Sequence, residues 1–283
     1  MALLLSPFVI GSAVLVVLPA LVTVALAFAR YDGMRPPVFT GLTNLRLLAA
    51  DPQVPLALLN TLVVVLVMVP LRVAGALLLA LLLQRPGPGV GTARAAVYLP
   101  AVIPDVAYAL VWVWVFNPLF GPVNLALGAV GLPQPGWLAD SATAKVPFIV
   151  MAVFGLGEGF VVLLAARKGV PVVLEEAAAI DGAGRLARFR WVLLPALVPW
   201  LVLLSIRDVI LGFQWTLGPA AIMTGGGPAR STLFVPQLIV EEAFDRFRYG
   251  TGSALMVVSA LLAGLLIAGI WVVARARGFR DAV

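Results

Sequence analysis

Two carboxylates, an Asp-Gly pair and three arginines follow one another between two long apolar runs of this chain. The stretch from Arg167 to Pro195 reads RKGVPVVLEEAAAIDGAGRLARFRWVLLP. The chain contains no histidine and no cysteine, so it lacks the commonest general base, the commonest metal ligand and the thiol nucleophile. The chemistry these charges favour is therefore recognition of another surface. We expect no catalytic residue, no metal site and no enzymatic activity.

Local signals in this stretch predict a helix, a turn and a second helix. Pro171 precedes a run of helix formers, and Glu175 and Glu176 fall early, where the positive end of a helix favours anions. Asp181-Gly182 is a turn or helix stop, and apolar residues then recur at helical spacing into the next apolar run. Two interpretations remain open: the first helix docks on a soluble partner, or it lies on the membrane with its arginines against lipid phosphates.

The elements on either side of this stretch must be membrane helices. The chain has 283 residues, of which 62% are hydrophobic and 11% charged, with a mean hydropathy of +1.09, whereas a soluble domain is about a quarter charged. Six stretches are long enough to span a bilayer and do not alternate as barrel strands would. We predict one all-α membrane domain over residues 1–283, the first stretch being an uncleaved span, with spans at 5–29, 57–83, 95–116, 146–166, 196–222 and 254–274.

Basic residues predict the orientation of these spans. The formal net charge is +6. The connections 84–94 and 167–195, together with both ends of the chain, carry ten Lys and Arg, including Arg275, Arg277 and Arg280; the other connections carry seven. The positive-inside bias then places both termini and the stretch 167–195 of this multi-pass membrane protein in the cytoplasm.

Polar and aromatic residues inside spans are candidates for a solute path, because polar groups are costly in a bilayer. Tyr108 and Trp112 are four residues apart and share a helix face that suits a sugar ring, although aromatic residues are also enriched at membrane interfaces. Arg207 and Asp208 are adjacent, so they need not pair with each other, and Glu158 or a partner subunit is the alternative. The candidate path residues are Tyr108, Trp112, Asn117, Glu158, Asp208, Gln214 and Trp215, with Gln214 the first choice.

The segment EAAAIDGAGRLARFRWVLLP resembles the EAA motif of permease subunits of ABC importers. The similarity falls on Glu176, Ala177, Ala178, Asp181, Gly182, Ala183, Phe189, Leu194 and Pro195. The subfamily that it resembles is the maltose type, which imports sugars and glycerol phosphate by binding-protein-dependent transport. Supporting pieces run along most of the chain, in the expected order: GLTNL at 41–45, LNTL at 59–62, LVWVWVFNPLFGPVN at 110–124, MTGGGPARST at 223–232, EEAF at 241–244 and YGTGSAL at 249–255.

The resemblance implies a coupling helix that sits in a cleft of a cytoplasmic ATP-binding subunit. Glu176 would be the docking carboxylate and Gly182 the turn. The residues assigned to this loop are Glu175, Glu176, Ala177, Ala178, Asp181, Gly182, Ala183 and Pro195. The resemblance also implies a second permease as heterodimer partner, two ATP-binding subunits and an extracytoplasmic solute-binding protein. It further implies that the chain lies in the bacterial cytoplasmic (inner) membrane.

No cofactor is expected in this chain, and ATP and Mg would be bound by the partner subunits. Gly225 to Gly227 are followed by Pro228 and no lysine, so they do not form a phosphate-binding loop. Membrane lipid is an expected partner and nucleic acid is not.

The solute itself is left open by the sequence. The resemblance implies a sugar or oligosaccharide carried inward by an ATP-driven importer. Glycerol phosphate or another non-sugar solute is an alternative that Arg207 keeps open. An ion-coupled secondary transporter would use Glu158, Arg207 and Asp208 as a relay, but it would show paired internal repeats, and none is recognisable here. An intramembrane enzyme is the least favoured reading.

Overall fold

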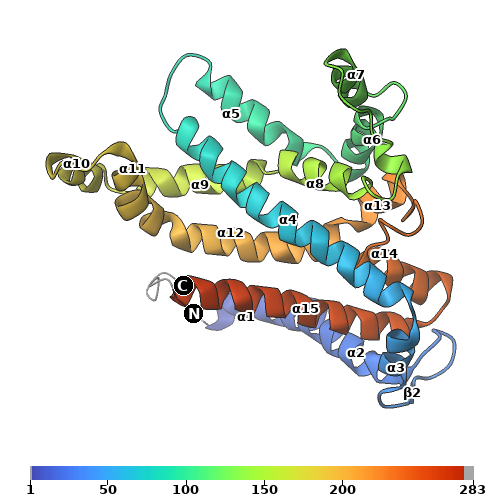
Figure 1. Ribbon diagram of the computed structural model, residues 1–283. Coiled ribbons are helices and arrows are strands. Elements are labelled where there is room, and N and C mark those ends of the chain that lie inside the picture. Colours follow the sequence, from blue (N-terminus) through green and yellow to red (C-terminus); the bar gives the residue numbers. More distant parts are fainter. Residues whose placement is uncertain (1, 277–283) are drawn as a thin grey trace.

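Three long helices form the centre of the molecule in the computed structural model, which describes residues 2–276. They are α4 (Gln53–Leu82), α12 (Leu194–Trp215) and α15 (Tyr249–Ala276), and α12 packs against both of the others (Figure 1). α4 begins where the Asp51 carboxylate accepts the backbone N–H of Gln53 at 2.8 Å, as a helix N-terminus requires. Arg277 and Arg280, used above for orientation, lie outside the described residues.

Two further segments complete the set of long apolar helices. α8 (Lys145–Phe154) and α9 (Gly157–Gly169) form one 25-residue stretch that packs on α4. α5 (Val90–Tyr98) and the short helix η2 (Leu99–Val102) are followed by α6 (Asp105–Val115). Within residues 2–276, five helices are long and apolar enough to cross a membrane, or six if this bent pair is one span. The all-α membrane fold is confirmed.

Two predicted spans differ from the observed helices. The stretch 95–116 is not one straight helix, because the chain bends by 105° between η2 and α6. Ile103 is extended there (ψ 131°), as the residue before a proline prefers. The stretch 196–222 is divided at Thr216 into α12 and a separate α13 (Leu217–Met223).

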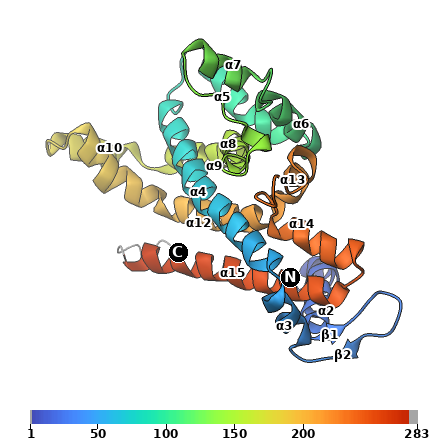
Figure 2. The same ribbon diagram turned by 45° about the vertical axis from the view of Figure 1, so that its right-hand side comes forward.

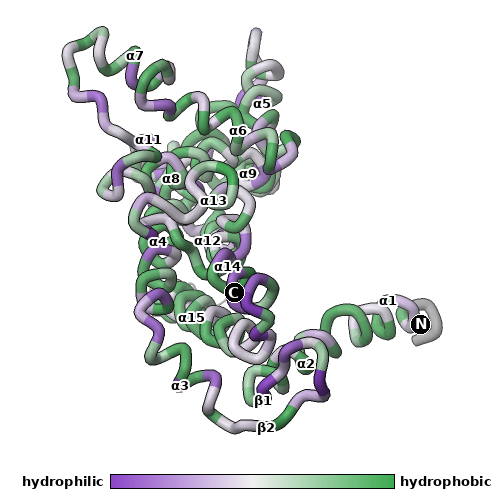
Figure 3. The backbone as a smooth tube through the Cα atoms, turned by 90° about the vertical axis from the view of Figure 1, so that its right-hand side faces the viewer, coloured by the Kyte–Doolittle hydropathy of each residue, from purple (hydrophilic) through white to green (hydrophobic). Residues whose placement is uncertain are grey.

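The first span stands apart from the rest. α1 (Ala2–Ser12), the π-helical turn η1 (Ala13–Val17) and α2 (Leu18–Ala27) run consecutively, and only α2 packs closely, against α15. Figure 3 shows this segment leaving the body of the molecule, with mostly hydrophobic residues along it. Its large apolar side chains from Leu5 onward are exposed, which is the surface expected of a helix in contact with lipid or another membrane chain.

One end of the bundle, called the hairpin end here, gathers the longer connections. It holds the β1–β2 pair, in which Ala29 is opposite Phe39 and Arg30 opposite Val38, and the short helix α3 (Thr43–Ala50) that follows it. Figures 1 and 2 show these elements together with α13 and α14 at this end. The remaining short elements are α7 (Pro122–Ala129), η3 (Trp137–Ala139), α14 (Val235–Val240) and η5 (Glu241–Asp245).

The opposite end, called the α10 end, carries the predicted helix-turn-helix. α10 (Val172–Ile180) is followed by a turn, by α11 (Arg185–Arg188) and by the π-helical turn η4 (Phe189–Leu193), which continues into α12. The predicted helix-turn-helix between spans four and five is therefore confirmed. The described ends of the chain, near α1 and the last turn of α15, lie toward this same end of the bundle (Figure 1).

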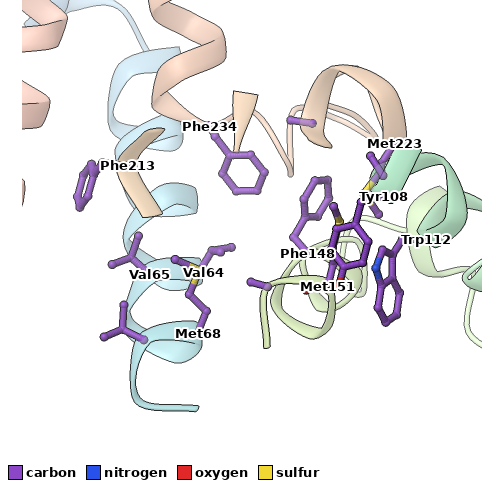
Figure 4. Packing of buried hydrophobic residues seen from close by; sticks show 14 of the residues in the cluster. Val64, Val65, Met68, Tyr108, Trp112, Phe148, Met151, Phe213, Met223 and Phe234 are labelled. Atoms are coloured by element: carbon purple, nitrogen blue, oxygen red, sulfur yellow. Dashed lines mark hydrogen bonds between the residues drawn. The ribbon is translucent and has the colours of Figure 1, made fainter. Parts of the chain in front are cut away.

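An aromatic and methionine-rich core joins α4, α6, α8 and α13. Tyr108 and Trp112 of α6 lie beside Phe148 and Met151 of α8, while Phe213 lies on the far side of the α4 residues (Figure 4). The Tyr108 hydroxyl donates to the Met151 carbonyl at 3.0 Å. This pairing satisfies a buried polar group, so it fixes α6 against α8 despite the bend that precedes α6.

Candidate solute cavity and coupling helix

A cavity of about 280 Å³ lies between α4, α6, α9 and α12. Four of the seven residues predicted for the solute path line it, and they come from α6, α9 and α12: Tyr108, Glu158, Asp208 and Trp215. Asp105, Arg72 and Arg207 line it too. The structure therefore brings charges from separate spans to one site, as expected of polar residues inside a membrane.

Two linked ion pairs cross this cavity wall. Arg72 Nε on α4 donates to Asp208 Oδ2 at 3.0 Å, and a second Arg72 nitrogen donates to the Ala152 carbonyl. Arg207 pairs with Glu158 of α9, and its Nη1 lies 3.4 Å from Asp208 Oδ1. Of the two alternatives left open by the sequence, Glu158 and a partner subunit, the structure shows Arg207 paired with Glu158. Arg207 and Asp208, which need not have paired, are also in contact.

The two pairs differ in exposure. The side chains of Arg72 and Asp208 are 13% and 6% exposed, whereas those of Arg207 and Glu158 are 34% and 50% exposed. A charge as buried as Asp208 needs a partner, and Arg72 supplies it. The Arg207–Glu158 pair is the part of this network that a solute in the cavity can reach.

The other three predicted path residues lie away from the cavity lining. Trp112 is buried in an aromatic cluster, stacked on Phe116 with ring centroids 5.6 Å apart. The Asn117 side-chain oxygen accepts the backbone N–H groups of Leu119 and Phe120, so it caps the turn after α6. Gln214, the first choice from the sequence, points instead to a groove lined by α14 and α15 residues such as Ile239 and Met256.

α10 is bounded by residues that start and stop helices. Pro171 precedes its first residue, and Glu175 lies in its first turn. At its end the N–H of Gly182 donates to the Ala179 carbonyl at 3.1 Å and the N–H of Ala183 to the Ala178 carbonyl at 2.9 Å, the paired bonds of a Schellman C-cap. Gly182 has φ +83°, a conformation that glycine adopts without steric cost.

The residues predicted for the coupling loop fall into distinct places on this element. Glu176 and Ala177 are exposed, Ala178 and Ala183 take part in the C-cap bonds, and Asp181 is the last position before the turn. Pro195 lies in the first turn of α12, directly after the π-helical turn η4. Glu175 instead pairs with Arg167 at 2.5 Å. Adjacent helix residues point about 100° apart, so one glutamate is held inward and the other is free.

The surface around Glu176 is apolar as well as charged. No residue of α10 is buried, and Ile180, Leu186 and Trp191 expose most of their side chains. Exposed apolar side chains beside free charges mark an interaction surface. Within residues 2–276 no group of three His, Cys, Asp or Glu side chains gathers to hold a metal ion.

Comparison with known proteins finds relatives that are named as permease proteins. No family profile matches the chain. The chain is 33% identical to the probable ABC transporter permease protein YesP of Bacillus subtilis, in an alignment that covers 93% of this chain and 86% of YesP. It is 33% identical to the lactose transport system permease protein LacF of Rhizobium radiobacter, over 86% of this chain and 82% of LacF. It is 31% identical to the sulfoquinovosyl glycerol transport system permease protein SmoG of Agrobacterium fabrum, over 90% and 84%.

Solved structures share the fold. A chain from the crystal structure of a bacterial ABC transporter involved in the import of the acidic polysaccharide alginate superposes with a TM-score of 0.79. The two chains are 22% identical, and the match covers 96% of this chain and 94% of that one. A chain from the crystal structure of a bacterial alginate ABC transporter in complex with an alginate pentasaccharide-bound periplasmic protein also superposes with a TM-score of 0.79. The chain therefore shares its overall fold with a chain of that transporter.

Proposed function

Because this chain belongs to the permease family of ABC transporters, we propose that it is one of two membrane subunits of an importer for a carbohydrate or related polyol. The second permease, two ATP-binding subunits and an extracytoplasmic solute-binding protein would complete the assembly. ATP and Mg would be bound by the ATP-binding subunits, and this chain would do no covalent chemistry. The α10 end would face the cytoplasm, as the basic residues near it favour, and the chain would sit in the cytoplasmic membrane of a bacterium.

The observation that carries this proposal is the unburied helix α10. Its sequence matches the EAA motif, its C-cap fixes the turn at Gly182, and its Glu176 carboxylate is exposed. η4 joins it to α12, which forms one wall of the cavity. A partner that moves α10 would therefore move a helix that contacts the solute, which is how a domain displacement reaches a distant site.

The charges of the cavity favour an uncharged, polyhydroxylated solute. Both arginines already have carboxylate partners, and the lining holds three carboxylates, those of Asp105, Glu158 and Asp208, against two arginines. An anionic solute such as a sugar phosphate would meet net negative charge at low dielectric, which is unfavourable. Hydroxyl groups can instead donate to Glu158 and accept from Arg207, while Tyr108 and Trp215 offer aromatic surface to a ring.

The test is to isolate the transporter from its own host through a tag on this chain, reconstitute it in nanodiscs, and measure ATP hydrolysis. We expect an ATP-binding subunit to co-purify with the wild type and to be lost with Glu176→Lys, because reversing the exposed charge disrupts docking. The matched control is Asp245→Lys, which reverses an exposed carboxylate at the hairpin end and should retain the subunit. If wild-type preparations contain no ATPase and uptake follows an ion gradient, the importer assignment is wrong.

A further inference from the structure

α10 is held to the rest of the molecule by few side-chain contacts. None of its nine residues is buried. The chain is well packed just before α10, at Val170, and again after α11 and η4, at Leu193, where both side chains form a buried cluster with Leu197. The helix is therefore an exposed segment between two fixed points, and apolar packing of its own side chains does not set its orientation.

One ion pair joins α10 directly to α9. Arg167 Nη2 lies 2.5 Å from Glu175 Oε1, and the two side chains are 14% and 25% exposed. Arg167 is in the last turn of α9 and Glu175 in the first turn of α10, so each charge also lies at the helix end whose dipole favours it. Within residues 2–276, no second ion pair links α10 to another element.

We propose that Arg167 and Glu175 are positioning residues, which hold the coupling helix α10 at a fixed angle to α9 so that displacement of α10 is transmitted to α9. This inference rests on the proposed function, because it requires a partner that moves α10. Without the pair, α10 would pivot at Val170–Pro171, where the chain is extended (ψ 122° and 125°). The pivot would then absorb part of the displacement.

The other end of α9 explains what the transmitted motion does. Glu158 in the first turn of α9 pairs with Arg207 of α12 across the cavity. α9 is thus connected by an ion pair at each end, to α10 at one and to the cavity wall at the other. A shift of α9 changes the distance between Glu158 and Arg207, and so changes the part of the site that the solute can reach.

The experiment measures the α9–α10 geometry with spin labels, which the absence of cysteine in this chain permits. Val161→Cys on α9 and Ala179→Cys on α10, both exposed, report on that angle. Val161→Cys and Val273→Cys report on movement of α9 against α15. Both pairs are measured by double electron–electron resonance in the reconstituted complex, with partner cysteines removed, before and after trapping with ATP and vanadate.

We expect a narrow Val161–Ala179 distance distribution in the wild type. In Arg167→Glu or Glu175→Arg, the population of conformers outside the wild-type distance peak should rise about two- to fivefold. This is the change expected from the free energy of one partly exposed ion pair. The vanadate-induced change in the Val161–Val273 distance should fall, while the ATP-binding subunits stay bound. Arg167→Lys should behave as wild type, and the double exchange Arg167→Glu with Glu175→Arg should restore both readouts. The matched control is Lys168→Glu, which makes the same charge change one residue away.

Three results would overturn the inference: unchanged distributions in both single variants, no restoration by the double exchange, or an equal effect of Lys168→Glu. Loss of the ATP-binding subunits in Glu175→Arg, as in Glu176→Lys, would make Glu175 a docking contact instead of a positioning residue and would also overturn it. Failure of the proposed function looks different, because no ATP-binding subunit would then accompany even the wild-type chain.

Discussion

Two connections of similar length join spans at opposite ends of this molecule, and they are held in opposite ways. Residues 224–248 at the hairpin end include Leu233, Phe234 and Val235, all fully buried. Residues 170–193 at the α10 end include a helix with no buried side chain. Both connections are built from short helices and turns, so secondary structure does not distinguish them; side-chain packing does.

The buried connection is fixed by polar side chains from other elements. The Asn60 amide of α4 donates to the carbonyls of Arg230 and Leu233, both at 3.0 Å, and the hydroxyl of neighbouring Thr61 accepts the N–H of Val235 at 2.9 Å. Asn44 likewise donates to the carbonyls of Ala27 and Ala29. Buried backbone groups satisfied in this way hold a loop in one conformation. One end of the bundle is therefore fixed by buried contacts, whereas the other exposes a helix that no buried side chain holds.

The largest expected effect is on stability, and it comes from replacing one glycine by alanine at each end of the bundle. In Gly250→Ala the new Cβ would overlap the Ala29 carbonyl oxygen and crowd Asn44, so we expect a loss of about 3 kcal/mol in stability. In the matched variant Gly184→Ala, no atom lies within 4 Å of the new Cβ, and the backbone φ is −65°. Stability should therefore change by no more than about 0.5 kcal/mol. Thermal unfolding in detergent measures both. Equal losses would show that the two ends are packed alike.

Removing the Asn60 amide should have the next largest effect. Asn60→Ala leaves the buried Leu233 carbonyl without its donor and removes one of the two donors to the Arg230 carbonyl, which keeps the Leu233 N–H; we expect a cost of about 2 kcal/mol. Proteolysis should then cut residues 224–248 first, because these carbonyls anchor that connection. Asn117→Ala is the control, since its side chain caps an exposed turn. If cleavage begins instead at the α10 end, Asn60 does not anchor the hairpin end.

The motifs that carried the resemblance explain how much of this could be foreseen. GLTNL and LNTL contain Asn44 and Asn60, yet their spacing says nothing of carbonyls 15 to 173 residues away in sequence. The six apolar stretches and the helix-turn-helix could be predicted, because hydropathy and turn residues are local signals. The bend before α6 has a local signal in Pro104, but its angle of 105° and the break at Thr216 depend on packing and could not be predicted.

The residues that line the cavity show the same limit of prediction from sequence. Glu158, Asp208 and Trp215 were identifiable because charged or aromatic residues stand out inside apolar runs. Arg72 stands inside such a run as well, between Pro70 and Gly75, and it is the signal that the sequence reading missed: a buried carboxylate required a cation on another span. Gln214 was misplaced relative to the cavity because the helical face that points inward is decided by neighbouring helices.

A smaller effect is expected at the free end from Gly182. Gly182→Ala meets no atom within 4 Å, but φ is +83°, so an added Cβ strains the backbone by about 1 kcal/mol. That strain should loosen the C-cap of α10 without unfolding the spans. Gly182→Asn should be milder, because asparagine tolerates this conformation. Hydrogen exchange of the Gly182 and Ala183 amides measures it; slower or unchanged exchange in Gly182→Ala would contradict the expectation.

The smallest effect concerns a turn at the hairpin end that the Asp32 carboxylate caps. The Asp32 carboxylate accepts the backbone N–H groups of Arg35 and Met34, each at 3.0 Å, and these bonds hold the pKa of Asp32 below its ordinary value of 3.8. A carboxyl whose pKa is lowered by folding contributes stability that is complete above the unfolded pKa and is lost as the pH falls through the folded pKa. The turn should therefore be unaffected near neutral pH and loosen only below pH 3.8.

A spin label at Met34→Cys, an exposed position in this turn, measures that transition. Its mobility should rise as the pH falls below 3.8. In Asp32→Ala the label should be mobile at every pH, because the acceptor is absent. Asp181→Ala at the α10 end is the control and should leave the label unchanged. A label that loosens at the same pH with and without Asp32 would show that this turn is held, like the rest of the hairpin end, by buried contacts and not by its own carboxylate.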